Sequence, residues 1–308
     1  MDKILDRLKA GEVLVCDGAM GTFLQAKGLE PGTCPELWCL ERADAVRDIH
    51  AQYRAAGSDI VETNSFGGTR YKLQLYGLAA QTVEINRAAA ALAREVAGDS
   101  QYVLGSVGPT GEFMAPLGSE TEADFYAAFS EQVIALEQGG ADLVIIESMT
   151  AVEEAAAAVR AAKENTALTV IVSFTFDPRI DGGYASMMGV TPARFAAELT
   201  AAGADIIGTN CGTGPDHMIE VVRLLRAAAA PEIPVLAMPN AGMPELENGV
   251  TVFRATPAEV GAKARALVAA GAGIVGGCCG TGPAHIAAIC QAVRSRAGRP
   301  GPAGPDAQ

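Results

Sequence analysis

The chain has 308 residues, of which 49% are hydrophobic and only 5% aromatic, and its 36 acidic and 23 basic residues give a net charge of −13. This charge argues against nucleic acid or an anionic membrane as the main partner, since both require a positive protein surface. The sequence shows no apolar signal-peptide core after Met1 and no uninterrupted apolar span of about eighteen residues. We therefore expect a cytoplasmic protein with no membrane span, whose seven cysteines are thiols rather than disulfides.

Short runs rich in β-branched residues alternate eight times with Ala-rich helical stretches. Several of the runs, such as residues 143–146, are apolar throughout, which is typical of parallel strands covered on both faces. Residues 122–138 and 257–270 have the apolar periodicity of helices. The strands are predicted to begin near Val13, Asp59, Tyr102, Asp142, Thr169, Asp205, Pro234 and Gly273.

Eight βα units in this length predict a single-domain (β/α)8 TIM barrel of the α/β class, covering residues 1–297. A doubly wound open sheet is the alternative, but it would require a different number of strands or a break in composition. Residues 298–308 are rich in Gly and Pro, and they are expected to form a flexible tail.

Four helix-to-strand junctions share one pattern, in which a glycine is followed at once by an apolar strand. They lie at Gly57, Gly140, Gly203 and Gly271, before the second, fourth, sixth and eighth strands. The pattern favours a repeated pair of βα units. A simpler interpretation is that any helix-to-strand junction has this composition.

Functional residues of a barrel gather where its strands end. Three of the seven cysteines are predicted to follow strands there: Cys211 after the sixth strand, and Cys278 and Cys279 after the eighth. The loops after the strands are expected to be short, and short loops would leave this face of the barrel open. The exceptions are the longer stretches at residues 22–36 and 177–191.

Three thiolates with one open coordination position are typical of catalytic zinc. Soft sulfur ligands favour zinc over magnesium or calcium, although iron is also compatible. Neighbouring residues of a strand point to opposite faces, so Cys278 and Cys279 share a metal only if the backbone turns between them, which the flanking glycines permit. The alternative is a set of buried small cysteines or a vicinal disulfide.

Two histidines suggest a competing Cys2His2 site, because residues 211–217 and 279–285 repeat the pattern Cys-Gly-Thr-Gly-Pro-x-His. In each copy, however, the proline is predicted at the first position of a helix, which places His217 or His285 in the first helical turn. The third histidine, His50, is assigned to packing or to the surface. The remaining cysteines show no ligand-like spacing: Cys16, Cys34, Cys39 and Cys290.

The motifs after the strands resemble those of the homocysteine-binding domain family. This family includes betaine- and S-methylmethionine-homocysteine methyltransferases and the first module of cobalamin-dependent methionine synthase. The double cysteine after two glycines is highly specific, and residues 66–70 and 239–244 are most similar to the methionine synthase module. The resemblance rests on residues 17–22, 64–67, 108–111, 210–212, 239–242 and 277–281.

The resemblance implies a zinc-dependent transfer of a methyl group to the thiol of homocysteine, forming methionine. It makes Cys211, Cys278 and Cys279 the zinc ligands. Asp17 and Glu147 would hold the amino group of homocysteine. The backbone of Gly18 and Ala19 would line the same pocket. Asn240 would be a place-holder zinc ligand that gives way when the substrate sulfur binds.

No folate barrel or cobalamin module follows in the sequence, so the expected methyl donor is methylcobalamin or another methylcorrinoid on a separate protein. One alternative is a small donor: S-methylmethionine, betaine or S-adenosylmethionine. Others are a different thiol or selenol as acceptor, and a non-catalytic zinc-binding barrel subunit. Asp17 and Glu147 favour an amino-acid acceptor, since paired carboxylates suit an ammonium group.

Overall fold

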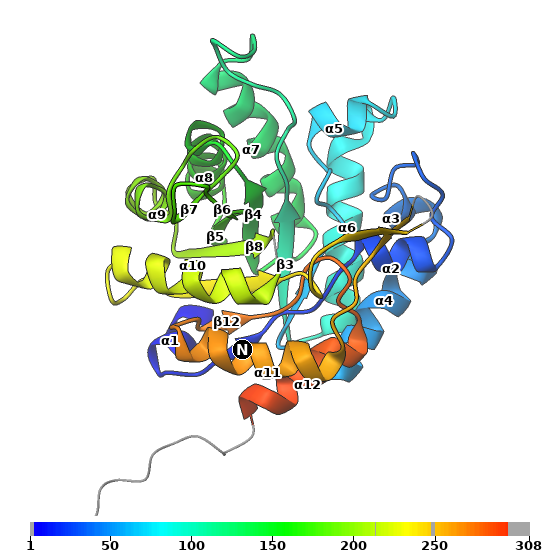
Figure 1. The fold of residues 1–308 in the computed structure, drawn as a ribbon. Helices are drawn as coiled ribbons and strands as arrows, with labels where there is room; N and C mark the ends of the chain where they lie inside the picture. Colours follow the sequence, from blue (N-terminus) through cyan, green and yellow to red (C-terminus); the bar gives the residue numbers. More distant parts are fainter. Residues whose placement is uncertain (1–2, 213, 248–249, 295–308) are drawn as a thin grey trace, which may run out of the picture.

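A computed structural model describes residues 3–212, 214–247 and 250–294. Its centre is a sheet of eight parallel strands in the order β1-β12-β9-β8-β5-β4-β3-β2 (Figure 1). A parallel bridge between Cys16 and Ile60 joins the two ends of this order, and the sheet thereby becomes a barrel. The strands are β1 (Leu14–Val15), β2 (Ile60–Glu62), β3 (Tyr102–Val107), β4 (Leu143–Met149), β5 (Thr169–Phe174), β8 (Ile206–Cys211), β9 (Val235–Pro239) and β12 (Ile274–Val275).

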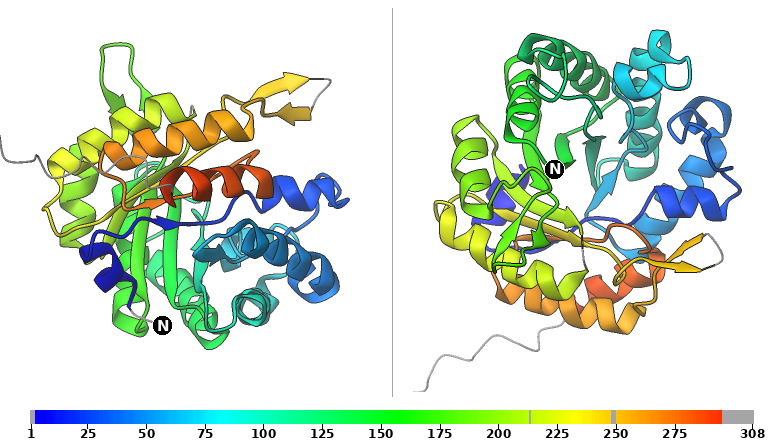
Figure 2. Two further views of the ribbon diagram at one scale, coloured as in Figure 1. Left: turned by 90° about the horizontal axis from the view of Figure 1, so that it is seen from below. Right: turned by 45° about the horizontal axis from the view of Figure 1, so that its top comes forward.

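Every strand of the barrel begins within one residue of its predicted start. The (β/α)8 barrel is therefore confirmed, and the open-sheet alternative is wrong. The helices surround the strands (Figure 2), and the predicted helix 122–138 is reproduced in full. The outer helices are α4 (Ala43–Ala56), α6 (Thr82–Ala97), α7 (Glu122–Gln138), α8 (Val152–Asn165), α9 (Pro192–Ala201), α10 (Pro215–Ala228), α11 (Pro257–Ala269) and α12 (Pro283–Arg294).

Two apolar layers explain why the strands are continuous hydrophobic runs. One layer fills the barrel and includes Cys16, Leu104 and Met238, with Ile4 of helix α1 (Ile4–Lys9) packed among them. The other layer lies between the strands and the outer helices and contains most of the buried Val and Ala side chains. Since both faces of each strand are covered, neither face requires polar residues.

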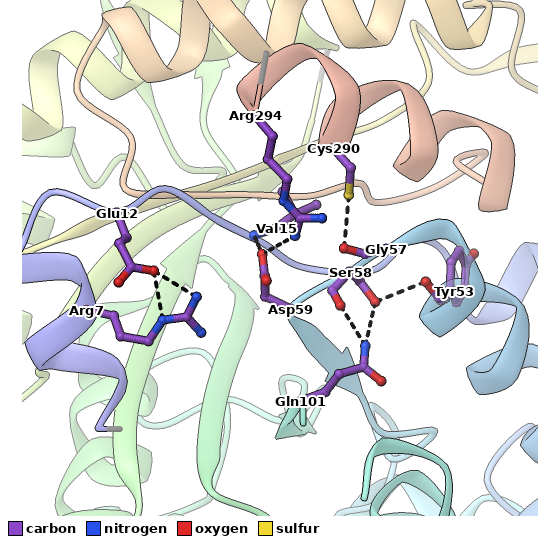
Figure 3. Close-up of polar contacts among 10 residues, drawn as sticks. All are labelled: Arg7, Glu12, Val15, Tyr53, Gly57, Ser58, Asp59, Gln101, Cys290 and Arg294. Carbon is purple, nitrogen blue, oxygen red and sulfur yellow. Dashed lines mark hydrogen bonds and ion pairs between the residues drawn. The ribbon is translucent and has the colours of Figure 1, made fainter. Parts of the chain in front are cut away.

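The glycine repeat marks a hydrogen-bonded junction at the amino ends of the strands. Asp59 Oδ2 accepts the backbone N–H of Val15 at 2.9 Å and pairs with Arg294 Nη2 at 2.8 Å. Cys290 of α12 donates to the carbonyl of Gly57 at 3.2 Å (Figure 3). These contacts tie the last helix to the first two strands. Equivalent aspartates accept from the preceding strand and pair with a helix cation: Asp142 with Val103 and Arg94, and Asp205 with Val170 and Lys163.

The prediction of short loops after the strands is wrong at three further places. The β2–α6 connection carries α5 (Arg70–Gln74) and the 3-10 turn η1 (Ala79–Gln81), the β3–α7 connection spans residues 108–121, and the β9–α11 connection carries a hairpin. These elements are too short to produce a recognisable hydrophobic period. The hairpin, β10 (Glu245–Glu247) with β11 (Val250–Val252), projects from the barrel in both views of Figure 2.

The two regions expected to be long do contain extra structure. Residues 177–191 include the paired strands β6 (Asp177–Pro178) and β7 (Tyr184–Ala185), and α2 (Gly21–Ala26) and α3 (Trp38–Glu41) lie between β1 and α4. The predicted tail, 298–308, lies outside the described residues. Within those residues, no helix has the length and apolar character needed to cross a membrane.

Candidate active site

Three cysteines meet at the carboxyl end of the barrel. Cys211 ends β8, and Cys278 and Cys279 follow β12. Their three sulfur atoms all lie within 4.8 Å of one another, and the Sγ atoms of Cys278 and Cys279 are 4.0 Å apart. Tetrahedral zinc with bonds of about 2.3 Å would hold its sulfur ligands roughly 3.8 Å apart. The spacing of the thiols therefore fits one zinc ion.

The backbone makes this cluster possible by turning after β12. Cys278 N donates to Pro239 O at 2.8 Å, Ala241 N donates to Cys279 O at 2.9 Å, and Thr281 N then closes a turn onto Cys278 O at 3.1 Å. Cys211 has a φ of 63°, a conformation that is rare for residues other than glycine and that often marks functional sites. The turn expected between the paired cysteines is thus present.

Hydrogen bonds among the three cysteines shift the pKa values of Cys211 and Cys278 in opposite directions. Hydrogen bonds from the thiols of Cys278 and Cys279 lower the pKa of Cys211 far below its usual range. The same hydrogen bond to Cys211, with one to Cys279 and burial, raises the pKa of Cys278 well above its usual range. The cluster therefore favours a thiolate at Cys211 stabilised by neighbouring donors.

Asn240 lies beside the sulfur cluster with one donor engaged and one acceptor free. Its Nδ2 donates to Gly212 O at 2.9 Å and lies 3.8 Å from Cys211 Sγ. Its Oδ1 is buried and has no hydrogen-bond partner in the described part of the chain. Buried polar atoms normally have a partner, so this free oxygen is suited to bind a metal ion.

A cavity of about 420 Å³ opens above the cysteines. Its wall combines all three sulfur residues with Gly18 and Ala19, which the sequence analysis assigned to the pocket. The wall also carries carboxylates but no Lys, Arg or His among the described residues that line it. Such a cavity favours cationic groups. Its acidic members are Glu36, Glu62 and Glu147.

Glu147 is the predicted amino-group ligand that lies in the cavity wall. Ser106 Oγ donates to its Oε1, and Asn210 Nδ2 donates to its Oε2 at 3.1 Å. Asn210 Oδ1 in turn accepts from Ser148 N at 3.0 Å and from Ser173 Oγ at 2.7 Å. Burial raises the pKa of Glu147. Its orientation is fixed by neighbours on β3 and β8.

Asp17, the second predicted amino-group ligand, lies behind the cavity wall rather than in it. The residue is only 2% exposed. Its Oδ2 accepts from Glu62 N at 3.0 Å, and its Oδ1 faces Cys16 Sγ at 3.6 Å. Burial raises the pKa of Asp17 to about 8.

Glu62 and Ser106 line the cavity, but the sequence analysis gave neither of them a role. Burial, together with the charge of the nearby Glu147 carboxyl group, raises the pKa of Glu62 well above its usual range. It also belongs to a second group of possible metal-ligand atoms, with Cys16 and Asp17, that lie within 4.8 Å of one another. Both residues lie near the carboxyl ends of their strands, where functional residues of a barrel gather. This position is the sequence signal that could have identified them.

Neither histidine of the repeated motif joins the cysteines. His217 Nδ1 lies 3.1 Å from the hydroxyl of Tyr184, and His285 contacts the carbonyl of Ala255 at 2.9 Å. Each is in the first turn of its helix, after Pro215 and Pro283 respectively. The Cys2His2 arrangement is therefore absent from the described residues.

Comparison with known proteins identifies relatives of this chain. The family model described as homocysteine S-methyltransferase matches residues 14–293. Methionine synthase of Mycobacterium tuberculosis is 36% identical over 302 residues, covering 91% of this chain but 24% of that protein. The chain thus spans about a quarter of the length of such relatives. Betaine–homocysteine S-methyltransferase 1 of Danio rerio is 32% identical, covering 96% of this chain and 76% of that protein.

A solved structure has the same architecture. The metallated form of the homocysteine methyltransferase MmuM from Escherichia coli matches with a TM-score of 0.75 and 25% sequence identity. The match covers 94% of this chain and 99% of that one.

Proposed function

The chain belongs to the homocysteine S-methyltransferase family, and we propose that it transfers a methyl group to the sulfur of homocysteine, giving methionine. The observation that carries the proposal is the cluster of Cys211, Cys278 and Cys279 in the wall of a cavity that also presents Glu147. The cysteine cluster suits a metal that binds the substrate sulfur, and Glu147 suits the ammonium group. The cavity would therefore bind both ends of one amino acid.

Zinc is the metal that we propose for the cysteines, and the spacing of the sulfur atoms and the free oxygen of Asn240 fit it. When bound, the ion would keep the substrate sulfur as the nucleophilic thiolate, which a free thiol of pKa ~8.5 populates to only about 3% at pH 7. Asn240 would occupy the fourth position in the absence of substrate, since its Oδ1 has no other partner in the described part of the chain.

The remaining residues bind and orient the amino acid. Glu147 would accept a hydrogen bond from the ammonium group directly, while Asp17 would support this end of the cavity from behind its wall, through the hydrogen bond that Glu62 N donates to Asp17 Oδ2. The backbone at Gly18 and Ala19 forms the adjoining surface. Fixing the acceptor sulfur relative to a methyl donor removes much of the entropic cost of the reaction.

A methylcorrinoid, presented by a corrinoid-binding protein module, is the donor that we propose. The similarity to methionine synthases over a quarter of their length supports it. A small donor is the second candidate. It is favoured by two relatives, one named for betaine and one for S-methylmethionine, of which this chain covers 76% and 80%. The long loops around the cavity also favour it.

The test is methionine formation from homocysteine by the zinc-loaded protein. Methylcobalamin, S-methylmethionine, betaine and S-adenosylmethionine are supplied in parallel, and methylcobalamin is also supplied on a corrinoid protein. We expect slow turnover with free methylcobalamin and faster turnover when the corrinoid protein presents it. Turnover with a small donor alone would select the second candidate. Metal binding without methionine from any donor would instead indicate a non-catalytic zinc barrel.

A further inference from the structure

A single hydroxyl group joins the turn of the paired cysteines to the neighbouring wall of the cavity. Thr281 Oγ1 donates to Cys278 O at 2.7 Å and accepts from Ala19 N at 3.2 Å. Ala19 follows β1 and Cys278 follows β12, and both residues line the cavity. Thr281 itself is only 2% exposed and lies behind the cavity wall. Its hydroxyl therefore connects two parts of the wall from behind.

Helix α4 holds the same junction from the outside of the barrel. Tyr53 is fully buried, and its hydroxyl oxygen lies 2.8 Å from Ala19 O and 3.0 Å from Thr281 O. A phenol has one proton, so it shares its donation between these two carbonyl groups. Ala19 N also donates to Thr281 O at 3.1 Å. The backbones of Ala19 and Thr281 are thus held side by side.

Two glycines leave the space that the Thr281 hydroxyl occupies. A Cβ atom on Gly18 would lie 2.9 Å from Thr281 Oγ1, and one on Gly277 would lie 2.3 Å from the same atom. Both distances are shorter than the non-bonded contacts that a Cβ atom makes, so glycine is needed at both positions. The glycine directly before the cysteine pair is therefore explained by its contact with Thr281.

We propose that Thr281 is a positioning residue, whose hydroxyl fixes the cysteine turn at Cys278 relative to the wall at Gly18 and Ala19, so that homocysteine reaches the metal and this wall together. The inference rests on the proposed function and adds a residue to the same site. Homocysteine carries its thiol and its amino-acid group on one short chain. A shift of about 1 Å between the two parts of the wall would therefore misplace one end of the substrate.

The hydroxyl can be removed without leaving its backbone partners unpaired, since Ala19 N also donates to Thr281 O and Cys278 O also accepts from Thr281 N. Thr281→Ser keeps the hydroxyl and loses the methyl group, whereas Thr281→Ala loses both. The comparison of these two variants isolates the hydroxyl. Thr281→Val is unsuitable, because a methyl group in the place of Oγ1 would lie 2.7 Å from Cys278 O.

Two thiols separate the joint requirement from metal binding alone. Homocysteine would contact both the metal and the wall, whereas ethanethiol has no amino-acid group and would contact the metal only. The experiment measures the affinity of wild-type protein and both variants for each thiol. The protein is loaded with cobalt(II) in place of zinc, because thiolate binding changes the visible absorption of cobalt. Metal content and circular dichroism are measured for each protein.

Homocysteine affinity should stay within about twofold of wild type in Thr281→Ser and should fall roughly three- to tenfold in Thr281→Ala, as expected for the loss of the hydroxyl's hydrogen bonds. Ethanethiol affinity and metal content should be the same in all three proteins, because the cysteine turn keeps its backbone hydrogen bonds.

Three results would overturn the proposal while wild-type protein still prefers homocysteine to ethanethiol. Wild-type homocysteine affinity in Thr281→Ala would show that the hydroxyl positions nothing. Equal losses in Thr281→Ser and Thr281→Ala would assign the effect to the methyl group. A parallel loss of ethanethiol binding would show that Thr281 supports the metal site alone. If wild-type protein binds homocysteine no better than ethanethiol, the proposed function itself fails, and this inference fails with it.

Discussion

Asn240 Nδ2 lies 3.8 Å from Cys211 Sγ, while the Oδ1 atom of the same amide is buried without a hydrogen-bond partner in the described part of the chain. The amide nitrogen thus lies beside the sulfur cluster, while the amide oxygen has no hydrogen-bond partner among the described residues. This relationship connects β8 and β9 at the candidate metal centre and predicts how the centre responds to substrate.

Removing that oxygen should weaken zinc binding only when homocysteine is absent. We expect the zinc affinity of Asn240→Ala to fall roughly tenfold or more, within the range found when groups supporting a metal site are removed. Saturating homocysteine should restore it, because the substrate sulfur then occupies the fourth position. Competition with a chelator, with and without homocysteine, measures both values. An equal loss under the two conditions would exclude a place-holder role.

The cysteine cluster should account for the bound zinc. Cys278→Ser is expected to lose most of the roughly one zinc ion per chain, because a weaker oxygen ligand replaces one of three thiolates. Cys290→Ser is the matched control, since Cys290 is buried in α12 and its thiol donates to Gly57 O, away from the cluster. Elemental analysis with circular dichroism tests the pair. Full zinc content in Cys278→Ser would rule out this site.

The two amino-group carboxylates should differ in their effects. Glu147→Gln removes a charge that lines the cavity, and it should weaken homocysteine binding by about 1.5–3 kcal/mol if the charge-assisted hydrogen bond is buried. Asp17→Asn should weaken it less, because Asp17 lies behind the wall. Zinc content should stay unchanged in both variants.

Glu154→Gln supplies the control for these titrations. Glu154 is also a buried glutamate, but its carboxylate accepts from Thr110 outside the cavity. Calorimetric titration of homocysteine should give wild-type affinity for this variant. Unchanged affinity in Glu147→Gln as well would place the ammonium group elsewhere.

His50 should make the fold sensitive to mild acid. Both ring nitrogens are buried without a partner in the described part of the chain, and burial lowers the pKa of His50 to about 4. An unfolded histidine titrates near ~6.5, so the unfolded state binds the extra proton between these pH values. The contribution of neutral His50 to stability is therefore complete above pH ~6.5 and is lost as the pH falls towards about 4, by roughly 3 kcal/mol.

The substitution His50→Leu should flatten this part of the stability profile. Denaturant unfolding at several pH values, expressed as the difference in unfolding free energy between H50L and wild-type protein, isolates the histidine from the buried carboxyl groups. Exposed His217 is the control, and H217Q should leave the profile unchanged. A pH-independent difference between H50L and wild type would contradict the assignment.

Local patterns were sufficient for the barrel and for the choice of cysteines. The hydrophobic runs located every strand start within one residue, because strands covered on both faces must be apolar whatever their neighbours are. The repeated prolines before His217 and His285 correctly indicated helix starts, since proline at the first helical position is a local preference. The short hairpin and one-turn helices of the loops were missed because they contain too few residues to show a period.

By itself, the sequence determined the (β/α)8 architecture, the end of the barrel that carries the site, and Cys211, Cys278 and Cys279 as its candidate ligands. Only the tertiary structure decided that Glu62 and Glu147 line the same cavity and that Asp17 lies behind its wall. The physical reason is that hydrophobic period and turn preference act between near neighbours in the chain. The hydrogen bonding and burial of these carboxylates depend on distances between side chains from different strands, which exist only once the barrel has closed.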